Sequence, residues 1–119
     1  MQNLMREQCL RTIADGEVPE SVRLANERVA VVFTQSWCGD WKFMRRYLQR
    51  LSVQALSVFF VEYDREPFFD EMKSFKENVF KNAKLPYVRY YRNGNFVGDS
   101  NLIFLRRRFL KKFDVKAFS

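Results

Sequence analysis

Residues 29–41 decide the fold and read Val-Ala-Val-Val-Phe-Thr-Gln-Ser-Trp-Cys-Gly-Asp-Trp. The first five are an unbroken apolar run, which is typical of a strand buried on both faces. The residues after Cys38 repeat apolar side chains with helical spacing, so the cysteine lies where a strand ends and a helix begins. Free N–H groups in a first helical turn favour negative charge. We therefore interpret Cys38 as a candidate nucleophilic thiol.

This motif contains no second thiol. Trp41 stands where a C-x-x-C pair would have its second cysteine, and Cys9 is the other cysteine of the chain. Cys9 falls on the apolar side of a predicted helix, which favours a small buried side chain over a disulfide partner. A bond between Cys9 and Cys38 requires their Cα atoms to lie within about 7 Å, and the sequence leaves that distance open. With no histidine and two cysteines, a protein-only zinc site is not expected.

Length and composition predict one domain over residues 1–119, because 119 residues with 47% apolar content suffice for a single core. Two cysteines are too few for a disulfide framework, and Arg6, Glu7 and Arg11 interrupt the stretch where a signal peptide would be apolar. No apolar run approaches the roughly 20 residues that cross a bilayer, so no membrane role is expected. We therefore expect a cytoplasmic protein.

The formal net charge is +7, and the basic residues gather in two places. One is the C-terminal third, residues 81–119. The other is one side of the helix after Cys38, made of Lys42, Arg45, Arg46, Gln49 and Arg50. A solvated helix face is the simplest interpretation. The alternative is attraction to an acidic protein, an anionic cofactor or nucleic acid. Because the chain carries no recognised nucleic-acid motif, nucleic acid is not the expected partner.

Apolar periodicity and turn residues predict the order of the elements. Helices are expected over residues 3–14, 19–26, 39–51 and 67–80, and strands over 29–35 and 57–63. The Asn93-Gly94 dipeptide predicts a hairpin between residues 86–92 and 95–97, and Ser100 or Asn101 is the expected cap of a last helix. This order predicts an α/β fold in which helices enclose a four-stranded mixed sheet.

Residues 29–113 resemble the thioredoxin-like superfamily. Trp37-Cys38-Gly39 matches the start of the family's active-site motif, and Leu85 with Pro86, ahead of the hairpin, matches its cis-proline segment. The resemblance implies a thioredoxin-like fold, to which residues 1–28 add an N-terminal helical segment.

The resemblance also implies a substrate site around Cys38. Pro86 is expected to be cis and to lie against Cys38, which leaves the backbone of Leu85 free to pair with an extended substrate. The candidate substrate-binding residues are Trp37, Gly39, Asp40, Trp41, Leu85 and Pro86.

Two departures from the thioredoxin pattern argue against ordinary dithiol reduction. Trp41 replaces the resolving cysteine, and Val32 stands where thioredoxins carry a buried acid. One cysteine suffices in a monothiol cycle, where a low-molecular-weight thiol such as glutathione supplies the second sulfur, as in glutaredoxin-like proteins.

The match to glutaredoxins is partial. Residues 98–100 resemble the segment with which glutaredoxins hold the γ-glutamyl end of glutathione. Gln35 lies where those proteins prefer a lysine, and Leu85 replaces their usual valine. The candidate anion-binding residues are Lys42, Arg45, Asp99 and Ser100.

Two functions remain open at this stage. The first is a monothiol thiol-disulfide oxidoreductase in cell redox homeostasis, with Cys38 as nucleophile and a protein or peptide thiol or disulfide as partner. The second is a redox-inactive binding module of the same fold, which recognises a peptide or an acidic protein. The first is an enzyme and the second is not, and the sequence is compatible with both.

Overall fold

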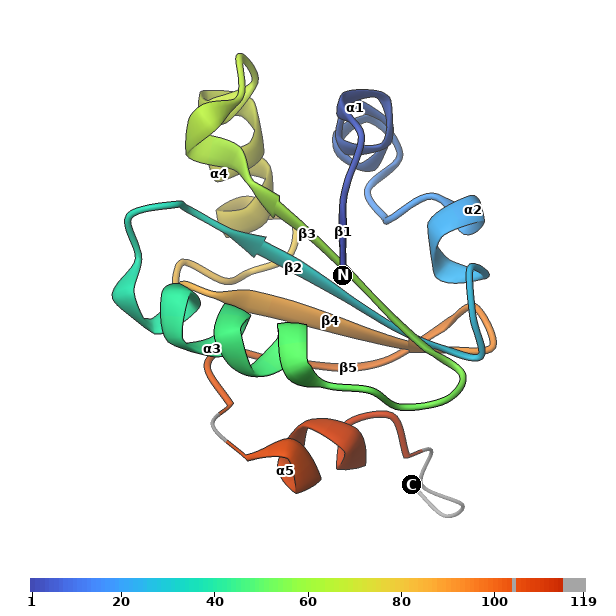
Figure 1. Cartoon of the computed structure of the whole chain (residues 1–119). Coiled ribbons are helices and arrows are strands. Elements are labelled where there is room, and N and C mark those ends of the chain that lie inside the picture. Colours follow the sequence, from blue (N-terminus) through green and yellow to red (C-terminus); the bar gives the residue numbers. More distant parts are fainter. Residues whose placement is uncertain (104, 115–119) are drawn as a thin grey trace.

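Two parallel strands, β2 (Arg28–Thr34) and β3 (Leu56–Glu62), form the centre of a mixed sheet and are connected through α3 (Gly39–Arg50). This computed structural model describes residues 1–103 and 105–114 (Figure 1). On its other side β2 pairs antiparallel with β4 (Tyr87–Arg92), which forms the predicted hairpin with β5 (Asn95–Ser100). The sheet is mixed and enclosed by helices, as predicted.

The sheet has a fifth strand that the sequence did not predict. Residues Gln2–Asn3 form β1, which pairs with the outer side of β3 and gives the strand order β1-β3-β2-β4-β5. The first helix therefore starts later than expected. The other elements are α1 (Arg6–Asp15), α2 (Glu20–Arg23), the 3-10 helix η1 (Tyr63–Arg65), α4 (Phe69–Asn78) and α5 (Arg106–Lys111).

The sheet separates two hydrophobic cores. In β2, Val29, Val31 and Phe33 face the first core, whereas Ala30 and Val32 face the second. Figure 1 shows α1 and α4 on one side of the sheet and α3 and α5 on the other. The N-terminal segment contributes to the first core, with Leu4, Cys9, Val18 and Val22 buried there. It therefore packs against the sheet opposite α3.

The predicted cap of the last helix is wrong. Ser100 is the last residue of β5, and α5 begins at Arg106 with Leu105 as its N-cap. The Ser100 hydroxyl lies 2.8 Å from the Tyr90 hydroxyl, and the Asn101 amide donates to the Pro86 carbonyl at 3.0 Å. Both polar side chains are thus used in contacts with neighbouring segments instead of capping a helix.

A buried arginine ties the N-terminal segment to the sheet. The Arg89 guanidinium pairs with the Glu17 carboxylate at 2.9 Å, and it donates to the Tyr91 and Tyr87 hydroxyls at 2.8 and 2.9 Å. It also lies 4.0 Å from the ring centroids of two phenylalanines. Because a buried charge is expensive without a partner, Glu17 is needed to keep Arg89 in this position.

Glu17→Gln removes the charge opposite Arg89 and keeps the size of the side chain. We expect the free energy of unfolding to fall by about 1.5–3 kcal/mol, the usual contribution of hydrogen bonds to charged groups. Urea denaturation followed by circular dichroism measures it. Glu20→Gln is the matched control, because Glu20 is exposed and makes no ion pair among the described residues. Its effect should stay within about 0.5 kcal/mol. Equal effects of the two changes would contradict a structural role for the Glu17–Arg89 pair.

Buried acids predict alkaline unfolding. Burial raises the pKa of Cys9 from 9.0 to about 12, and that of Tyr87 from 10.0 to about 12. The unfolded chain releases these protons at lower pH than the native chain, so their contribution to stability is complete below pH 9 and disappears by about pH 12. Lys76 acts in the opposite direction, since burial lowers its pKa from 10.5 to about 8. Its charge destabilises the fold below pH 8, and this effect is relieved by pH 10.5.

We therefore expect the urea midpoint to fall between pH 10.5 and 12, after the relief at Lys76 is complete. In the same pH range the free energy of unfolding should decline with pH less steeply in Tyr87→Phe, by about 1.4 kcal/mol per pH unit, because one titrating proton has been removed. A midpoint that stays constant up to pH 12 would contradict the burial of these groups.

Candidate functional site

Two loops meet at one end of the sheet. Residues 35–38 follow β2, and residues 85–86 precede β4. Because Phe33 of β2 and Tyr87 of β4 are paired in register, the two loops emerge side by side. Leu85 is half-buried and packs against the second core, which contains Cys38. The peptide bond between Leu85 and Pro86 is cis. The structure thus brings Cys38 and this segment to the same edge.

Cys38 is the N-cap residue of α3. Its N–H donates to the Gln35 carbonyl at 3.2 Å, and its carbonyl accepts from the Lys42 N–H at 3.1 Å. The residue is 7% exposed and its thiol is free. Gly39 and Asp40 form the start of the helix and are exposed. The thiol therefore lies at the start of a helix and is largely, but not completely, shielded from solvent.

The loop that carries Cys38 is fixed by η1. The Ser36 N–H and hydroxyl donate to the two carboxylate oxygens of Asp64 at 2.7 and 2.6 Å. The Trp37 indole N–H donates to the Gln35 side-chain oxygen at 2.6 Å, yet the Trp37 side chain is 65% exposed. The loop is therefore held in place while it presents an indole ring to solvent beside Cys38. Asp64 is a functional residue that local sequence patterns do not indicate, because its role depends on a contact across 28 residues of chain.

The prediction that Trp41 binds substrate is wrong, because its side chain is fully buried. The indole N–H donates to the Glu62 carboxylate at 2.8 Å, and the ring lies 5.7 Å from that of Phe60. Arg45 pairs with the same carboxylate at 3.1 Å, so this candidate anion-binding residue is already engaged. At the position of a resolving cysteine, the chain thus has a core side chain anchored to the end of β3.

Cys9 is not a resolving thiol for Cys38. Cys9 is fully buried in the first core, whereas Cys38 belongs to the second, and β2 lies between the two. Burial, with a smaller contribution from the Glu66 carboxylate, raises the pKa of Cys9 to about 12. The Cys9 thiol is therefore far from its ionised, reactive form at neutral pH. The choice left open by the sequence is resolved in favour of a buried packing residue.

The segment before β4 is held from one side. The Asn101 amide donates to the Pro86 carbonyl, and it exchanges two hydrogen bonds, of 3.0 and 3.2 Å, with the Asn82 amide. The buried Lys76 ammonium donates to the Asn82 carbonyl at 2.8 Å. Within residues 1–103 and 105–114, neither the N–H nor the carbonyl of Leu85 has a hydrogen-bond partner. The Leu85 backbone is thus available to another strand, whereas Pro86 itself is buried.

The expected glutathione-holding segment is not at a helix N-terminus. Asp99 and Ser100 lie within β5, and α5 starts at Arg106. The Asp99 carboxylate accepts from the Tyr87 hydroxyl at 2.9 Å, and the Ser100 hydroxyl bonds Tyr90. Both side chains are engaged in the hairpin. The structure therefore does not offer them as an anion site together with Lys42.

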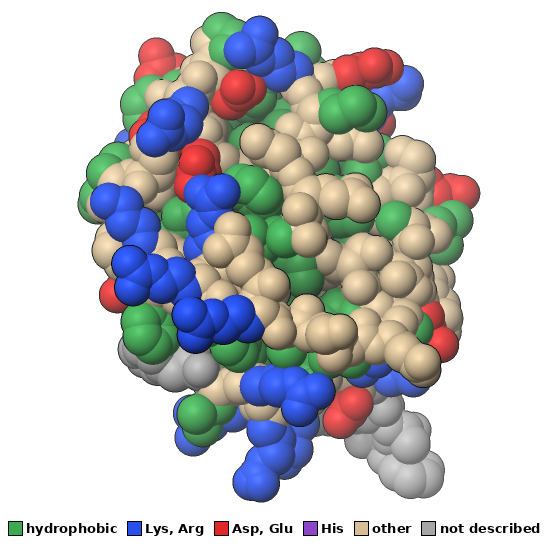
Figure 2. Space-filling view, viewed as in Figure 1, with side chains coloured by type: hydrophobic (Ala, Val, Ile, Leu, Met, Phe, Trp, Pro, Cys, Tyr) green, Lys and Arg blue, Asp and Glu red, His purple; other side chains and the backbone are tan. Residues whose placement is uncertain are grey.

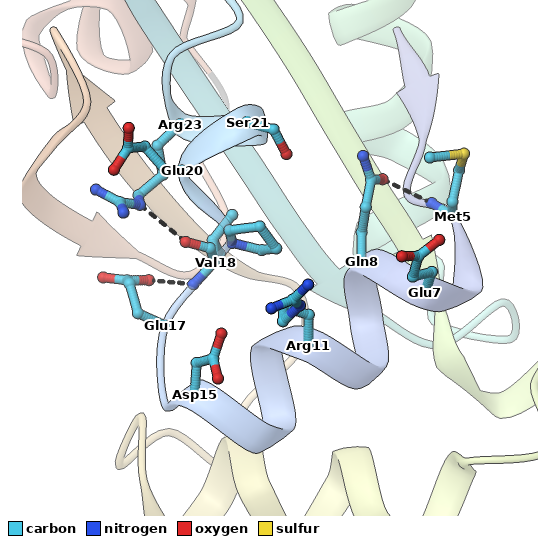
Figure 3. A pocket seen from close by; sticks show the side chains of 11 residues that line it. Met5, Glu7, Gln8, Arg11, Asp15, Glu17, Val18, Glu20, Ser21 and Arg23 are labelled. Atoms are coloured by element: carbon cyan, nitrogen blue, oxygen red, sulfur yellow. Dashed lines mark hydrogen bonds between the residues drawn. The ribbon is translucent and has the colours of Figure 1, made fainter.

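A cavity of about 480 Å³ lies between α1 and α2, and neither Cys9 nor Cys38 lines it. Figure 3 shows side chains of both charge signs around it, including Glu7, Arg11 and Glu20. The Glu17 carboxylate in its wall already accepts from the Val18 N–H. Of the residues that the structure describes, no group of three or more acidic, cysteine or histidine side chains is placed to hold a metal ion.

The two tryptophans give a direct test of this geometry. Trp41→Phe loses the indole contact with Glu62 and leaves a small void, so we expect the free energy of unfolding to fall by about 2 kcal/mol. Trp37→Phe, the control, alters an exposed ring and loses its hydrogen bond to the Gln35 side chain without opening a void in the core, so it should lower stability by no more than about 1 kcal/mol. Urea denaturation of both variants measures the difference. A larger loss for Trp37→Phe than for Trp41→Phe would contradict the assignment of Trp41 to the core.

Comparison with solved structures identifies the fold. The chain is similar to Trxlp from Edwardsiella tarda, with 18% identity, a TM-score of 0.59 and coverage of 98% of this chain and 100% of that chain. It is similar to Plasmodium falciparum thioredoxin, with 24% identity, a TM-score of 0.57 and coverage of 76% and 85%. It is also similar to buckwheat glutaredoxin in a glutathione complex, with 16% identity, a TM-score of 0.55 and coverage of 92% and 90%.

No protein-family model and no curated protein sequence matches the chain. No helix in the described part of the chain has the length and apolar character needed to span a bilayer. The structural similarities establish the α/β architecture that was expected from the sequence. This chain has a thioredoxin-like fold.

Proposed function

We propose that this protein is a monothiol thiol-disulfide oxidoreductase in which Cys38 is the nucleophile. The observation that carries the proposal is the position of Cys38, a single thiol at the N-cap of α3 beside the Leu85 backbone, which has no hydrogen-bond partner in the described part of the chain. The fold shared with thioredoxins and glutaredoxins supports it. We expect the first-turn N–H groups of α3, with Lys42 one turn along, to stabilise the thiolate.

The cycle needs one protein cysteine and a thiol from solution. The Cys38 thiolate attacks the glutathione sulfur of a glutathionylated protein, forms a Cys38–glutathione disulfide and releases the protein thiolate, which takes a proton from water. A second glutathione, as thiolate, then attacks the glutathione sulfur bound to Cys38. This step regenerates Cys38 and forms oxidised glutathione. Overall, one disulfide is exchanged for another. The protein sulfur is reduced from a disulfide to a thiol, and the sulfur of the incoming glutathione is oxidised from a thiol to a disulfide.

The residues around Cys38 suit a protein or peptide partner. An extended segment can add to the Leu85 backbone as a short strand, with the exposed Trp37 ring as an apolar contact. Gly39 and Asp40 form the rim on the helix side. Lys42 is exposed there and favours partners with acidic residues near their thiol. Such chemistry belongs to a reducing compartment, for which the cytoplasm is our proposal.

No dedicated glutathione site is part of this proposal. Asp99 and Ser100, the residues expected to hold the γ-glutamyl end, have their side chains bonded within the hairpin. Glutathione therefore enters as a thiol from solution. Any other small thiol with a comparable pKa should sustain the cycle.

A second candidate function is a binding module without turnover. It is favoured by the contrast between Cys38, which is 7% exposed, and Trp37, which is 65% exposed. In that case the exposed indole and the Leu85 backbone hold a peptide, and the thiol is a packing residue.

Two single-cysteine variants distinguish the candidates. Cys9→Ser leaves Cys38, and Cys38→Ser leaves Cys9 in the first core as an internal control. We expect iodoacetamide to alkylate the native Cys9→Ser variant at neutral pH and to leave native Cys38→Ser unmodified until it is unfolded. The Cys9→Ser variant should also catalyse the reduction of a glutathionylated peptide by glutathione, whereas Cys38→Ser should not. Alkylation without turnover, or no alkylation of Cys38, would contradict the oxidoreductase and leave the binding module.

A further inference from the structure

We propose that α3 and α5 together form a docking surface for nucleic acid, which binds through its sugar–phosphate backbone. We call this surface the α3–α5 face, and its cations are Lys42, Arg46, Arg50, Arg106, Arg107, Arg108 and Lys111. All are exposed, and none makes an ion pair within residues 1–103 and 105–114. Figure 2 shows Lys and Arg side chains gathered over the part of the molecule where α3 and α5 lie.

The fold makes one surface from two basic stretches that are far apart in the sequence. Tyr47 of α3 and Phe109 of α5 pack edge to face, with ring centroids 6.1 Å apart. A hollow of about 430 Å³ lies at this junction, and Arg50 and Arg106 both line it. A second hollow, of about 470 Å³, is lined by the cations Arg28, Arg106, Arg107 and Lys111 and by one carboxylate, that of Asp114. Arg106 therefore stands between two recesses that are rich in positive charge.

The charges of this face are not compensated by its own helices. Asp40 is the one carboxylate within α3, and α5 contains none. Arg45, the remaining cation of α3, already pairs with Glu62. Three consecutive arginines, residues 106–108, occupy the first turn of α5, where the helix dipole favours acidic side chains. Arg108 and Lys111 also belong to the last turn of this short helix, where the dipole favours cations, so Arg106 and Arg107 are the two that gain nothing from the helix and are better explained by binding.

The composition of the face favours nucleic acid over protein or membrane. Protein–protein interfaces are depleted of charged residues at their core, whereas protein–nucleic acid interfaces are much more positive. Five of the seven cations are arginines, whose planar fork matches a phosphate group. A membrane-binding helix presents a continuous apolar face. The exposed large apolar side chains in these segments are Phe43 and Leu105, which are too few to form such a face.

Nucleic acid was not the partner expected from the sequence, and the α3–α5 face changes that expectation. That expectation rested on the lack of a recognised motif, and the α3–α5 face uses none. No base-reading element is part of the proposal, so binding should be independent of nucleotide sequence and steeply dependent on salt.

The test is fluorescence anisotropy with two labelled single-stranded oligonucleotides of equal length, one oligothymidylate and one of mixed sequence. We expect equal affinity for both, with log Kobs falling linearly with log salt by about 0.7 per phosphate neutralised. The double variant Arg50→Glu, Arg106→Glu should lose two phosphate contacts. We expect its affinity to fall at least tenfold and its salt slope to become shallower by about 1.4, which is about 0.7 for each lost contact.

The matched control is Arg11→Glu with Lys84→Glu. Both residues are exposed and lie outside α3 and α5, and the change in net charge is the same. We expect the affinity of this control to stay within about threefold of the unmodified protein, because only long-range charge is altered. Both double variants should keep the urea midpoint and the alkylation rate of Cys38. The binding test and the activity test are therefore independent. The protein can bind nucleic acid even if the proposed oxidoreductase activity is absent.

Four results would overturn the proposal. The first is no binding of either oligonucleotide at low salt, and the second is an equal loss of affinity in both double variants. The third is competition by polyglutamate at the same charge concentration as the oligonucleotide, which would indicate an acidic protein as partner. The fourth is binding to phosphatidylserine vesicles without binding to the oligonucleotides, which would indicate a membrane surface.

Discussion

The burial of β2 on both of its faces is the constraint on which the rest of the structure depends. Its neighbours β3 and β4 fix its register, so alternate side chains must enter different cores. Val31 belongs to the first core and Val32 to the second. Because the side-chain period of a strand is two, a shift of one residue would exchange these two sets. The strand therefore determines which helix lies on which side of the sheet.

The positions of the two thiols follow from this division. Cys9 enters the first core with the N-terminal segment, whereas Cys38 follows β2 at the start of α3, which covers the second core. The sheet keeps them apart, so any chemistry at Cys38 depends on a sulfur supplied by another molecule. At position 41, where a dithiol site would hold its second cysteine, the indole is instead fixed to Glu62 at the end of β3. Trp41 therefore has a packing role, whereas Cys38 remains at the N-terminus of α3, where a nucleophilic thiol would lie.

Local patterns predicted the elements that depend on local chemistry. The apolar run of residues 29–33 and the Asn93-Gly94 turn carry strong signals for a buried strand and a hairpin, and both lie in the structure where they were expected. The two-residue strand β1 has no such signal, because its pairing depends on the exposed edge of β3. The Arg89–Glu17 pair joins residues 72 positions apart, and nothing in either local pattern indicates the other.

The site was predicted in part for the same reason. The motif around Cys38 is local, and helical spacing places Trp41 in line with the buried Met44 and Leu48. That spacing was the better guide to Trp41, which the family resemblance had assigned to a substrate groove. The bonds that Asn101 and Asp64 make to the two loops depend on tertiary contacts, which no local pattern around either residue indicates.

The most direct test of the single-thiol account is to treat the native protein with oxidised glutathione and to map the modified cysteines by mass spectrometry. The account predicts one glutathione adduct, confined to Cys38, that persists until a reducing thiol is added. A disulfide between Cys9 and Cys38 formed in the native protein would contradict it, because the sheet would then not separate the two thiols.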